Sequence, residues 1–188
     1  MNFLGHFFLS GSSKPIIIGN FIADFVKGKE YQNFSDDIAE GILMHREIDF
    51  FTDNHTAFKK TKKRIVENQG HFSGVVVDVF YDHFLALDFE KIAGTQLAGF
   101  ARKMYSVIDE YVDQLPPQSK FLFGYMKRDN WLLRYREKEG INKTLVGLSK
   151  RVKFKNSMHM AIDDLEVHYS SIREDFYAFI EDIRRNFK

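Results

Sequence analysis

Apolar residues recur every three or four positions along almost the whole chain, and clean alternation of apolar and polar residues is hard to find. This is the spacing of amphipathic helices, and only 3 prolines occur in 188 residues. The length fits one domain, and neither an internal repeat nor a flexible linker divides it. We therefore predict an all-α fold, a single-domain helical bundle spanning residues 1–188.

Turn residues set the expected helix boundaries. Gly28 and Gly70 are good helix ends, and Pro116-Pro117 predicts a turn after which the helical pattern resumes at once. The segment 72–88 is rich in Val and Phe and could be a buried strand, although its length and Asp spacing favour a helix. The expected helices are 2–9, 15–28, 35–53, 56–69, 72–88, 95–114, 118–137, 141–154 and 157–186.

Composition excludes several classes of protein. The chain has no cysteine, so disulfides, zinc–thiolate sites and thiol nucleophiles are ruled out. Lys plus Arg number 27 and Asp plus Glu number 26, a balance unlike that of a nucleic-acid-binding protein. Apolar runs fall short of the ~20 residues of a membrane span, and the N-terminus lacks the charged region of a signal peptide. We expect a soluble cytoplasmic protein with no nucleic-acid or membrane partner.

Polar residues interrupt the apolar stripe of the helix expected at 35–53. Ile38 and Ile42 begin a stripe that should face the core. His45 and Asp49 continue it without a change of phase, so their side chains should also point inward.

Carboxylates occupy inward-facing positions in two further segments. Asp78 and Asp82 lie one helical turn apart on the face of Val75, so their side chains should project side by side. Asp24 lies one turn from Asn20 in an equally apolar segment.

Burying charged carboxylates is costly, and two carboxylates one turn apart also repel each other. A divalent cation removes both costs, and oxygen ligands with one or two imidazoles suit Mn²⁺ or Mg²⁺. The substitution Asp82→Ala should then abolish activity, and loss of the repulsion should stabilise the metal-free chain. The ligands that we expect to converge are Asp24, His45, Asp78 and Asp82.

Other interpretations of these residues remain open. Any one of the carboxylates could form a buried ion pair with Arg46, Arg64 or Lys27, and Asp53 could cap the next helix. A histidine near an apolar face is often a satisfied core residue. The argument for a metal site depends on the number of such residues in three successive helices.

Two basic runs stand out in an otherwise balanced chain. The run "KKTKKR" extends from Lys59 to Arg64, and "KRVKFK" extends from Lys150 to Lys155. Each could be a solvated helix face or a docking surface for an acidic partner. No Gly-rich phosphate loop or dinucleotide fingerprint accompanies them.

Four blocks in the first half of the chain carry a family resemblance. "MNFLGHFFLS", "GNFIADFVKG", "GILMHREIDFFTDNH" and "DVFYDHFLA" resemble, in this order, the acyl carrier protein phosphodiesterases, also called acyl carrier protein hydrolases. The blocks cover roughly residues 1–90, and "MKRDNWLLRY" extends the likeness into the second half. The positions that match are His6, Asn20, Asp24, His45, Arg46, Asp49, Asp53, His55, Asp78, Asp82 and His83.

The resemblance implies a helical fold similar to the HD-domain phosphohydrolases. It also implies Mn²⁺-dependent hydrolysis of the phosphodiester between 4′-phosphopantetheine and a serine of holo-acyl carrier protein, giving apo-carrier protein. The chain departs from the expected pattern at Gly5, where we expect Ala. The order Asp82-His83 is also the reverse of the His-Asp order of the wider HD superfamily, so that superfamily's ligand assignments do not transfer.

The stripes and the resemblance together give each residue an expected role. Asp49, His83 and Arg46 are the expected catalytic residues beside the four metal ligands.

An HD-type phosphohydrolase acting on a nucleotide would share the metal site but need a pocket for base and ribose. A non-catalytic helical interaction protein would hold the same residues as buried ion pairs. The expected docking residues for the acidic carrier protein are Lys59, Lys60, Lys62, Lys63 and Arg64.

Overall fold

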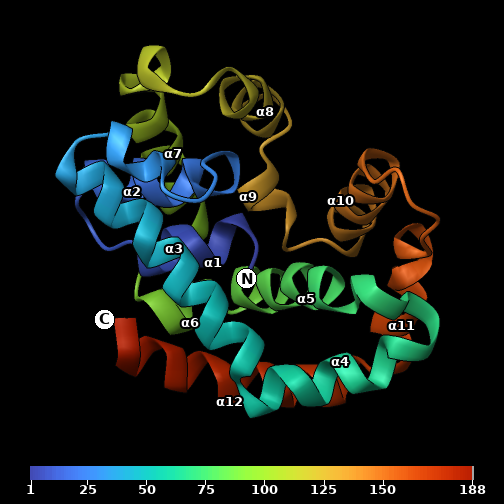
Figure 1. The fold of residues 1–188 in the computed structure, drawn as a ribbon. Helices are drawn as coiled ribbons and strands as arrows, with labels where there is room; N and C mark the ends of the chain where they lie inside the picture. Colours follow the sequence, from blue (N-terminus) through green and yellow to red (C-terminus); the bar gives the residue numbers. More distant parts are fainter. Residues whose placement is uncertain (188) are drawn as a thin grey trace.

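The computed structural model describes residues 1–187, and it is helical in the segments where apolar residues recur every three or four positions (Figure 1). No strand occurs in that part, and the segment that could have been a buried strand is helix α5 (Ser73–Leu87). The predicted all-α, single-domain fold is confirmed.

The remaining elements are short to medium helices joined by 3-10 turns. The other α-helices are α1 (Phe3–Leu9), α2 (Lys14–Ile22), α3 (Asp36–Asn54), α4 (Thr56–Gln69), α6 (Phe89–Ala93), α7 (Leu97–Glu110), α8 (Pro117–Arg128), α9 (Trp131–Arg134), α10 (Lys138–Arg151), α11 (Ala161–Val167) and α12 (Tyr169–Phe187). The 3-10 turns are η1 (Ala23–Phe25), η2 (Glu30–Asn33), η3 (Gly70–Phe72), η4 (Val112–Gln114) and η5 (Met158–Met160).

The first half of the chain agrees closely with the predicted boundaries, and the second half is more broken. Helix α2 ends at Ile22 and continues as η1, so the predicted helix does not reach Gly28. Asn130 has a left-handed backbone with φ 46°, which divides the predicted helix 118–137 into α8 and α9. The predicted helix 157–186 is divided into η5, α11 and α12, and the short helix α6 was not predicted.

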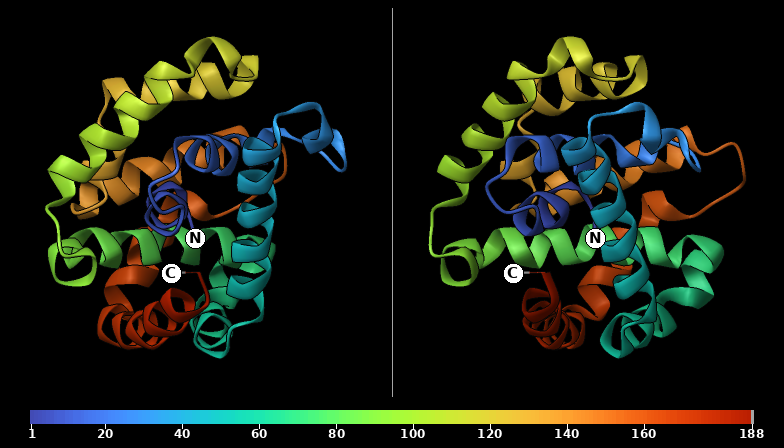
Figure 2. Two further views of the ribbon diagram at one scale, coloured as in Figure 1. Left: turned by 90° about the vertical axis from the view of Figure 1, so that its left-hand side faces the viewer. Right: turned by 60° about the vertical axis from the view of Figure 1, so that its left-hand side comes forward.

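Helix α5 runs through the middle of the molecule (Figure 2). Its Val76, Phe80 and Phe84 side chains are completely buried. Helices α4 and α12 lie on one side of α5, while α1 and α2 lie on the other. Within the described residues, no helix has both the length and the apolar content that a bilayer span requires.

Helices α2 and α3 cross at two glycines, and this crossing determines where the site residues lie. A Cβ atom on Gly19 would lie 2.1 Å from the carbonyl oxygen of Ile38. A Cβ atom on Gly41 would lie 2.3 Å from the carbonyl oxygen of Ile16. No side chain fits at either position, because the obstructing atoms belong to the backbone of the other helix. The two helix backbones are therefore in direct contact.

We predict that Gly19→Ala lowers the free energy of unfolding by about 1–3 kcal/mol, because the added methyl group forces the two backbones apart. The control is Gly99→Ala on α7, where a Cβ atom meets nothing within 4 Å. That control should stabilise the chain by about 0.5–1 kcal/mol through its helix propensity. Urea unfolding measures both changes. Equal stabilisation by the two substitutions would mean that the crossing is looser than described.

Candidate functional site

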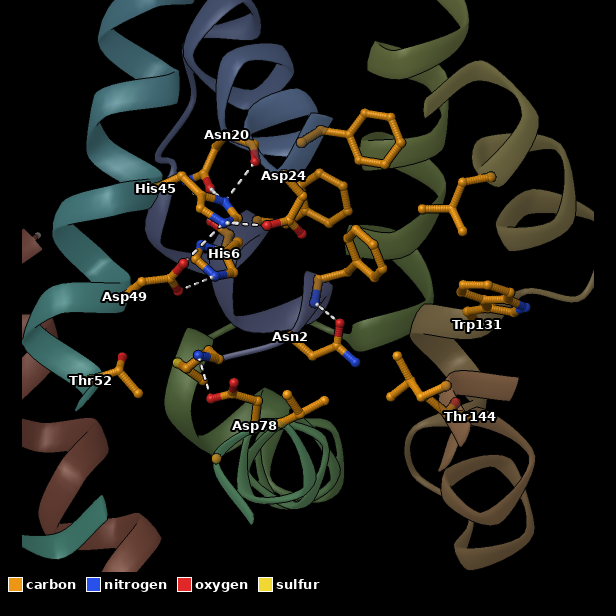
Figure 3. A pocket seen from close by; sticks show the side chains of 18 of the residues that line it. Asn2, His6, Asn20, Asp24, His45, Asp49, Thr52, Asp78, Trp131 and Thr144 are labelled. Atoms are coloured by element: carbon orange, nitrogen blue, oxygen red, sulfur yellow. Dashed lines mark hydrogen bonds and ion pairs between the residues drawn. The ribbon is translucent and has the colours of Figure 1, made fainter. Parts of the chain in front are cut away.

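Two imidazole rings and one carboxylate form the centre of the candidate site (Figure 3). His6 on α1 and His45 on α3 are stacked, with ring centroids 3.8 Å apart and ring planes at 9°. Asp49 on α3 faces both rings. Its Oδ1 lies 3.2 Å from Nε2 of His6, and its Oδ2 lies 3.2 Å from Nε2 of His45. The carboxylate of Asp49 therefore binds a ring of its own helix and links α3 to α1 through the ring of His6.

Asn20 on α2 fixes the orientation of His45. The Nδ1 atom of His45 lies 2.9 Å from the backbone carbonyl oxygen of Asn20 and 2.9 Å from its Oδ1, so Nδ1 carries the proton that it donates. The side-chain amide of Asn20 in turn donates to the carbonyl oxygen of His6. Nε2 of His45 therefore faces the carboxylates of Asp49 and of Asp24, whose Oδ1 lies 3.4 Å away.

The four ionisable groups of this cluster have shifted pKa values. Burial lowers the pKa of His45, but hydrogen bonds to Asp24 and Asp49 outweigh burial and raise it to about 9. Burial and repulsion by His45 lower the pKa of His6 to about 4. The hydrogen bond from His45 lowers the pKa of Asp24. Burial raises the pKa of Asp49, but hydrogen bonds from both histidines outweigh burial and hold it far below its usual range.

The cluster offers a suitable set of donors for a divalent cation. His6, His45 and Asp49 each offer one ligand atom, and these three atoms lie within 4.8 Å of one another. Nδ1 of His6 is buried without a hydrogen-bond partner, so the cluster alone leaves one ring nitrogen unsatisfied. Mixed imidazole and carboxylate donors suit several divalent cations, including Mn²⁺. The residues present therefore fit such an ion, with Asp24 beside it.

A pocket of 620 Å³ extends from this cluster across the molecule. In Figure 3 the two histidines lie on one side of the pocket, and Trp131 and Thr144 lie on the other. Thr52 and Tyr135 also line it, and both are almost completely buried. Their hydroxyl oxygens have no hydrogen-bond partner in the described part of the chain. The pocket therefore joins a charged cluster to unsatisfied hydroxyl groups and an aromatic wall.

Asp82 lies outside the pocket that contains His45, and Asp78 lines that pocket without joining the group formed by His6, His45 and Asp49, so the expected set of four ligands is not assembled here. Oδ2 and Oδ1 of Asp82 accept hydrogen bonds from the backbone N–H groups of Leu4 and Gly5, at 2.7 Å and 3.1 Å. Asp82 is completely buried and does not line the pocket. Asp78 does line it, but its Oδ1 pairs with the amino group of Met1 at 2.8 Å.

The departure at Gly5 has a steric basis. A Cβ atom on Gly5 would lie 2.4 to 2.7 Å from the side chain of Met1. An alanine at this position would require the Met1 side chain to move, whereas glycine lets that side chain pack against α1.

Arg46 and His83 do not line the pocket, and the catalytic roles expected for them stay predictions. The guanidinium of Arg46 donates to the carbonyl oxygens of Gly28 and Val26, so it holds the segment that follows η1. Nδ1 of His83 lies 2.7 Å from the carbonyl oxygen of Tyr135. Both side chains therefore have structural partners away from the cluster.

The ion pair considered for Arg64 and the helix cap considered for Asp53 both differ from the expectation. Arg64 pairs with Asp175 of α12, so it does not pair with any of the predicted ligands. Asp53 lines the pocket, and His55 caps α4 instead by accepting a hydrogen bond from the backbone N–H of Ala57. The cap lies two residues later than expected because α3 continues to Asn54.

Two charges of the basic run on α4 form ion pairs within the chain. Lys60 pairs with Asp175 at 3.2 Å, beside Arg64. Lys62 lines the pocket, and its ammonium lies 5.7 Å from the ring centroid of Phe58. The docking role of the run stays a prediction. Lys59, Lys60 and Lys63 are exposed, but Asp175 offsets part of the charge of Lys60.

Sequence reasoning did not place His6, Thr52, Tyr135 or Trp131 in the site. His6 was identified only by resemblance, because α1 is too short for its stripe to define an inward face. Tyr135 and Trp131 belong to the block "MKRDNWLLRY", which extends the family resemblance but by itself indicates no role for either residue. Thr52 lies three residues beyond Asp49 on the same stripe, so extending the stripe of α3 by one position finds it.

The fold and the cluster define an all-α protein with a pocket built on two buried imidazoles and on carboxylates that are partly exposed. A sequence model of the family named acyl carrier protein phosphodiesterase matches residues 1–183. The chain belongs to this family. No solved structure matches it, so the HD-like arrangement stays a prediction.

Curated relatives of the same name align with almost the whole chain. A protein of Enterobacter sp. (strain 638) is 32% identical over 180 residues, which cover 95% of this chain and 93% of the relative. Relatives of Photorhabdus laumondii and Salmonella agona are each 30% identical over 180 residues, covering 95% of this chain and 91% and 93% of their own lengths.

We predict that Asp82→Ala lowers the free energy of unfolding by about 1–3 kcal/mol, because two buried N–H groups at the start of α1 lose their acceptor. The control Asp82→Asn keeps a carbonyl acceptor and should lose less. Thermal unfolding of the metal-free protein compares the two. A stabilised Asp82→Ala variant would support the earlier expectation that carboxylate repulsion dominates at this position.

Proposed function

We propose that the chain hydrolyses the phosphodiester that joins 4′-phosphopantetheine to a serine of holo-acyl carrier protein. The products are apo-carrier protein and 4′-phosphopantetheine, and the reaction takes place in the cytoplasm with Mn²⁺ as the preferred ion. The observation that supports this most is the pocket that starts at the stacked histidines and contains further unsatisfied polar groups. The family and the names of its relatives give the substrate class.

His6, His45 and Asp49 would hold the cation, and Asp24 lies close enough to His45 to assist. A divalent cation at this position supplies positive charge for the phosphate oxygens and lowers the pKa of water. This ligand set replaces Asp78 and Asp82 of the sequence-based set with His6 and Asp49.

The residues of the chain prepare the site before any substrate arrives. Asn20 binds Nδ1 of His45, so the ring can present only Nε2 to the pocket. Asp49 stays ionised across the neutral range, because both rings stabilise its charge. It therefore serves as a ligand and a fixed negative charge rather than as a proton acceptor.

The buried hydroxyl groups of Thr52 and Tyr135 are suited to bind the phosphodiester. Each is a hydrogen-bond donor without a partner, and an unsatisfied buried donor costs free energy until a ligand accepts its bond. Phosphate oxygens are strong acceptors. Burial also raises the pKa of Tyr135 well above its usual value, so its hydroxyl remains protonated and able to donate.

The outward-facing part of the α4 run would steer the acidic carrier protein to this pocket. Lys62 already lines the pocket, and Lys59 and Lys63 lie on the same helix. Lys60 and Arg64 are less suited, since Asp175 offsets their charge. Charge complementarity of this kind mainly raises the association rate.

The first test is intact-protein mass measurement of holo-carrier protein incubated with the enzyme and Mn²⁺. We predict loss of the phosphopantetheine mass, no loss with chelator, and no loss with Asp49→Asn. The control Asp182→Asn makes the same change at a carboxylate that pairs with His55 outside the pocket, and it should stay active. A wild-type enzyme that leaves the holo-carrier protein intact with every divalent cation tested would contradict the proposal.

The second test reverses charge on α4. We predict that Lys59→Glu combined with Lys63→Glu raises the KM for holo-carrier protein several-fold and that added salt reduces this difference. Cleavage of bis(p-nitrophenyl) phosphate should hardly change. The control Lys103→Glu reverses an exposed charge on α7. Equal losses in the α4 variant and this control would exclude a docking role for α4.

A further inference from the structure

A second cavity of 820 Å³ lies between α8, α9 and α10. We propose that it binds the pantetheine arm of the holo-carrier protein while the phosphodiester lies at the His6–His45–Asp49 cluster. The inference rests on the proposed function, and it assigns the part of the substrate that the first pocket leaves unplaced. The volume falls in the usual range of about 300–1,000 Å³ for small-molecule sites.

Continuity with the first pocket is the main argument. Trp131, Thr144 and Phe25 line both cavities, as do Leu122 and Arg151, so the two cavities are direct neighbours. The pantetheine arm is attached directly to the phosphate. Any site for the arm must therefore lead away from the phosphate position, and the second cavity adjoins the side of the first pocket that lies opposite the histidines, at Trp131 and Thr144.

The lining combines aromatic and neutral polar side chains with four charged residues, Asp129, Arg134, Lys143 and Arg151, and its aromatic part suits the methyl groups of the arm. Phe121 and Tyr125 of α8 present aromatic surface to the cavity, with 68% and 39% of their surface exposed. Large apolar side chains exposed around a hollow are typical of binding sites. Thr144 and Gln118 add hydroxyl and amide groups that can bond the two amides of the arm.

The same rings are poorly placed to hold a nucleobase. A base is bound by stacking on a free aromatic face. The guanidinium of Arg128 lies 4.7 Å from the ring centroid of Tyr125 and takes one such face. Phe121 meets Tyr125 edge to face, at 71° between ring planes. The cavity therefore favours the arm over the base and ribose of a nucleotide.

Backbone strain beside Trp131 supports a binding role for this wall. Asn130 adopts the left-handed conformation, with φ 46°, immediately before Trp131. Its Oδ1 is buried without a hydrogen-bond partner. Strain of this kind costs on the order of 1–3 kcal/mol and is concentrated at functional sites. Here it holds Trp131 at the junction of the two cavities.

Gly147 allows the cavity to be filled without disturbing the fold. It lines the second cavity but not the first, and a Cβ atom there meets nothing within 4 Å. Gly147→Phe should raise the KM for holo-carrier protein at least about tenfold, equivalent to about 1.4 kcal/mol of binding. Hydrolysis of bis(p-nitrophenyl) phosphate should change less than about twofold, within roughly 0.4 kcal/mol. The control Gly99→Phe adds the same side chain on α7, where a Cβ atom also has open space and neither cavity lies, and should change neither reaction.

A binding measurement tests the cavity without catalysis. Trp131 is the single tryptophan of the chain, so intrinsic fluorescence reports on the junction directly. Titration with pantetheine, which lacks the phosphate, should give a saturable change in the wild type and in Gly99→Phe but not in Gly147→Phe. Titration with adenosine, which also lacks the phosphate, should give a weaker response.

The outcomes separate the two proposals. A wild-type enzyme that never releases phosphopantetheine would overturn the proposed function, whatever the titration shows. If the wild type is active and Gly147→Phe matches Gly99→Phe in KM and in pantetheine titration, the inference alone is overturned. Stronger binding of adenosine than of pantetheine would also overturn it.

Discussion

The close crossing of α2 and α3 is the constraint on which the site depends. Gly19 and Gly41 let the two backbones touch, and no other residue fits at either position. Asn20 follows Gly19 directly, and His45 lies one turn after Gly41. The crossing therefore brings the carbonyl of Asn20 to the ring of His45, and this contact fixes which nitrogen faces the pocket. The packing of α2 against α3 thus determines which ring nitrogen of His45 is available in the polar cluster.

The cluster brings several charges together in a pocket, where the carboxylates of Asp24 and Asp49 are partly exposed to solvent. His6 and His45 share the carboxylate of Asp49, and Asp24 adds a second negative charge beside them. Each charge is offset by a neighbour, which avoids the large cost of an isolated buried ion. Two carboxylates against one imidazolium leave an excess of negative charge. A cation would remove this excess, and the same region then becomes suited to a phosphate anion.

The helices could be predicted from the sequence because their apolar spacing is a local property. The stripe of α3 placed His45 inside correctly and turned Asp49 toward the same pocket, where its side chain is half-exposed. The stripe depends only on phase along one helix. The sequence could not tell which backbone Asp82 would meet, because the N–H groups of α1 are far away in the chain. The same limit applies to Tyr135, whose place in the pocket depends on the packing of α9 and α10. Long-range partners, rather than helix positions, were the part that sequence reasoning missed.

Locating the metal directly is the sharpest test of the account. Crystals grown with Mn²⁺ and measured for anomalous scattering should show a peak within bonding distance of His6, His45 and Asp49. Asp24 should lie at or next to this ion, and Asp82 should keep its bonds to the start of α1. A peak held by Asp78 and Asp82 instead, away from the stacked histidines, would contradict the central claim that the α2–α3 crossing assembles the metal site.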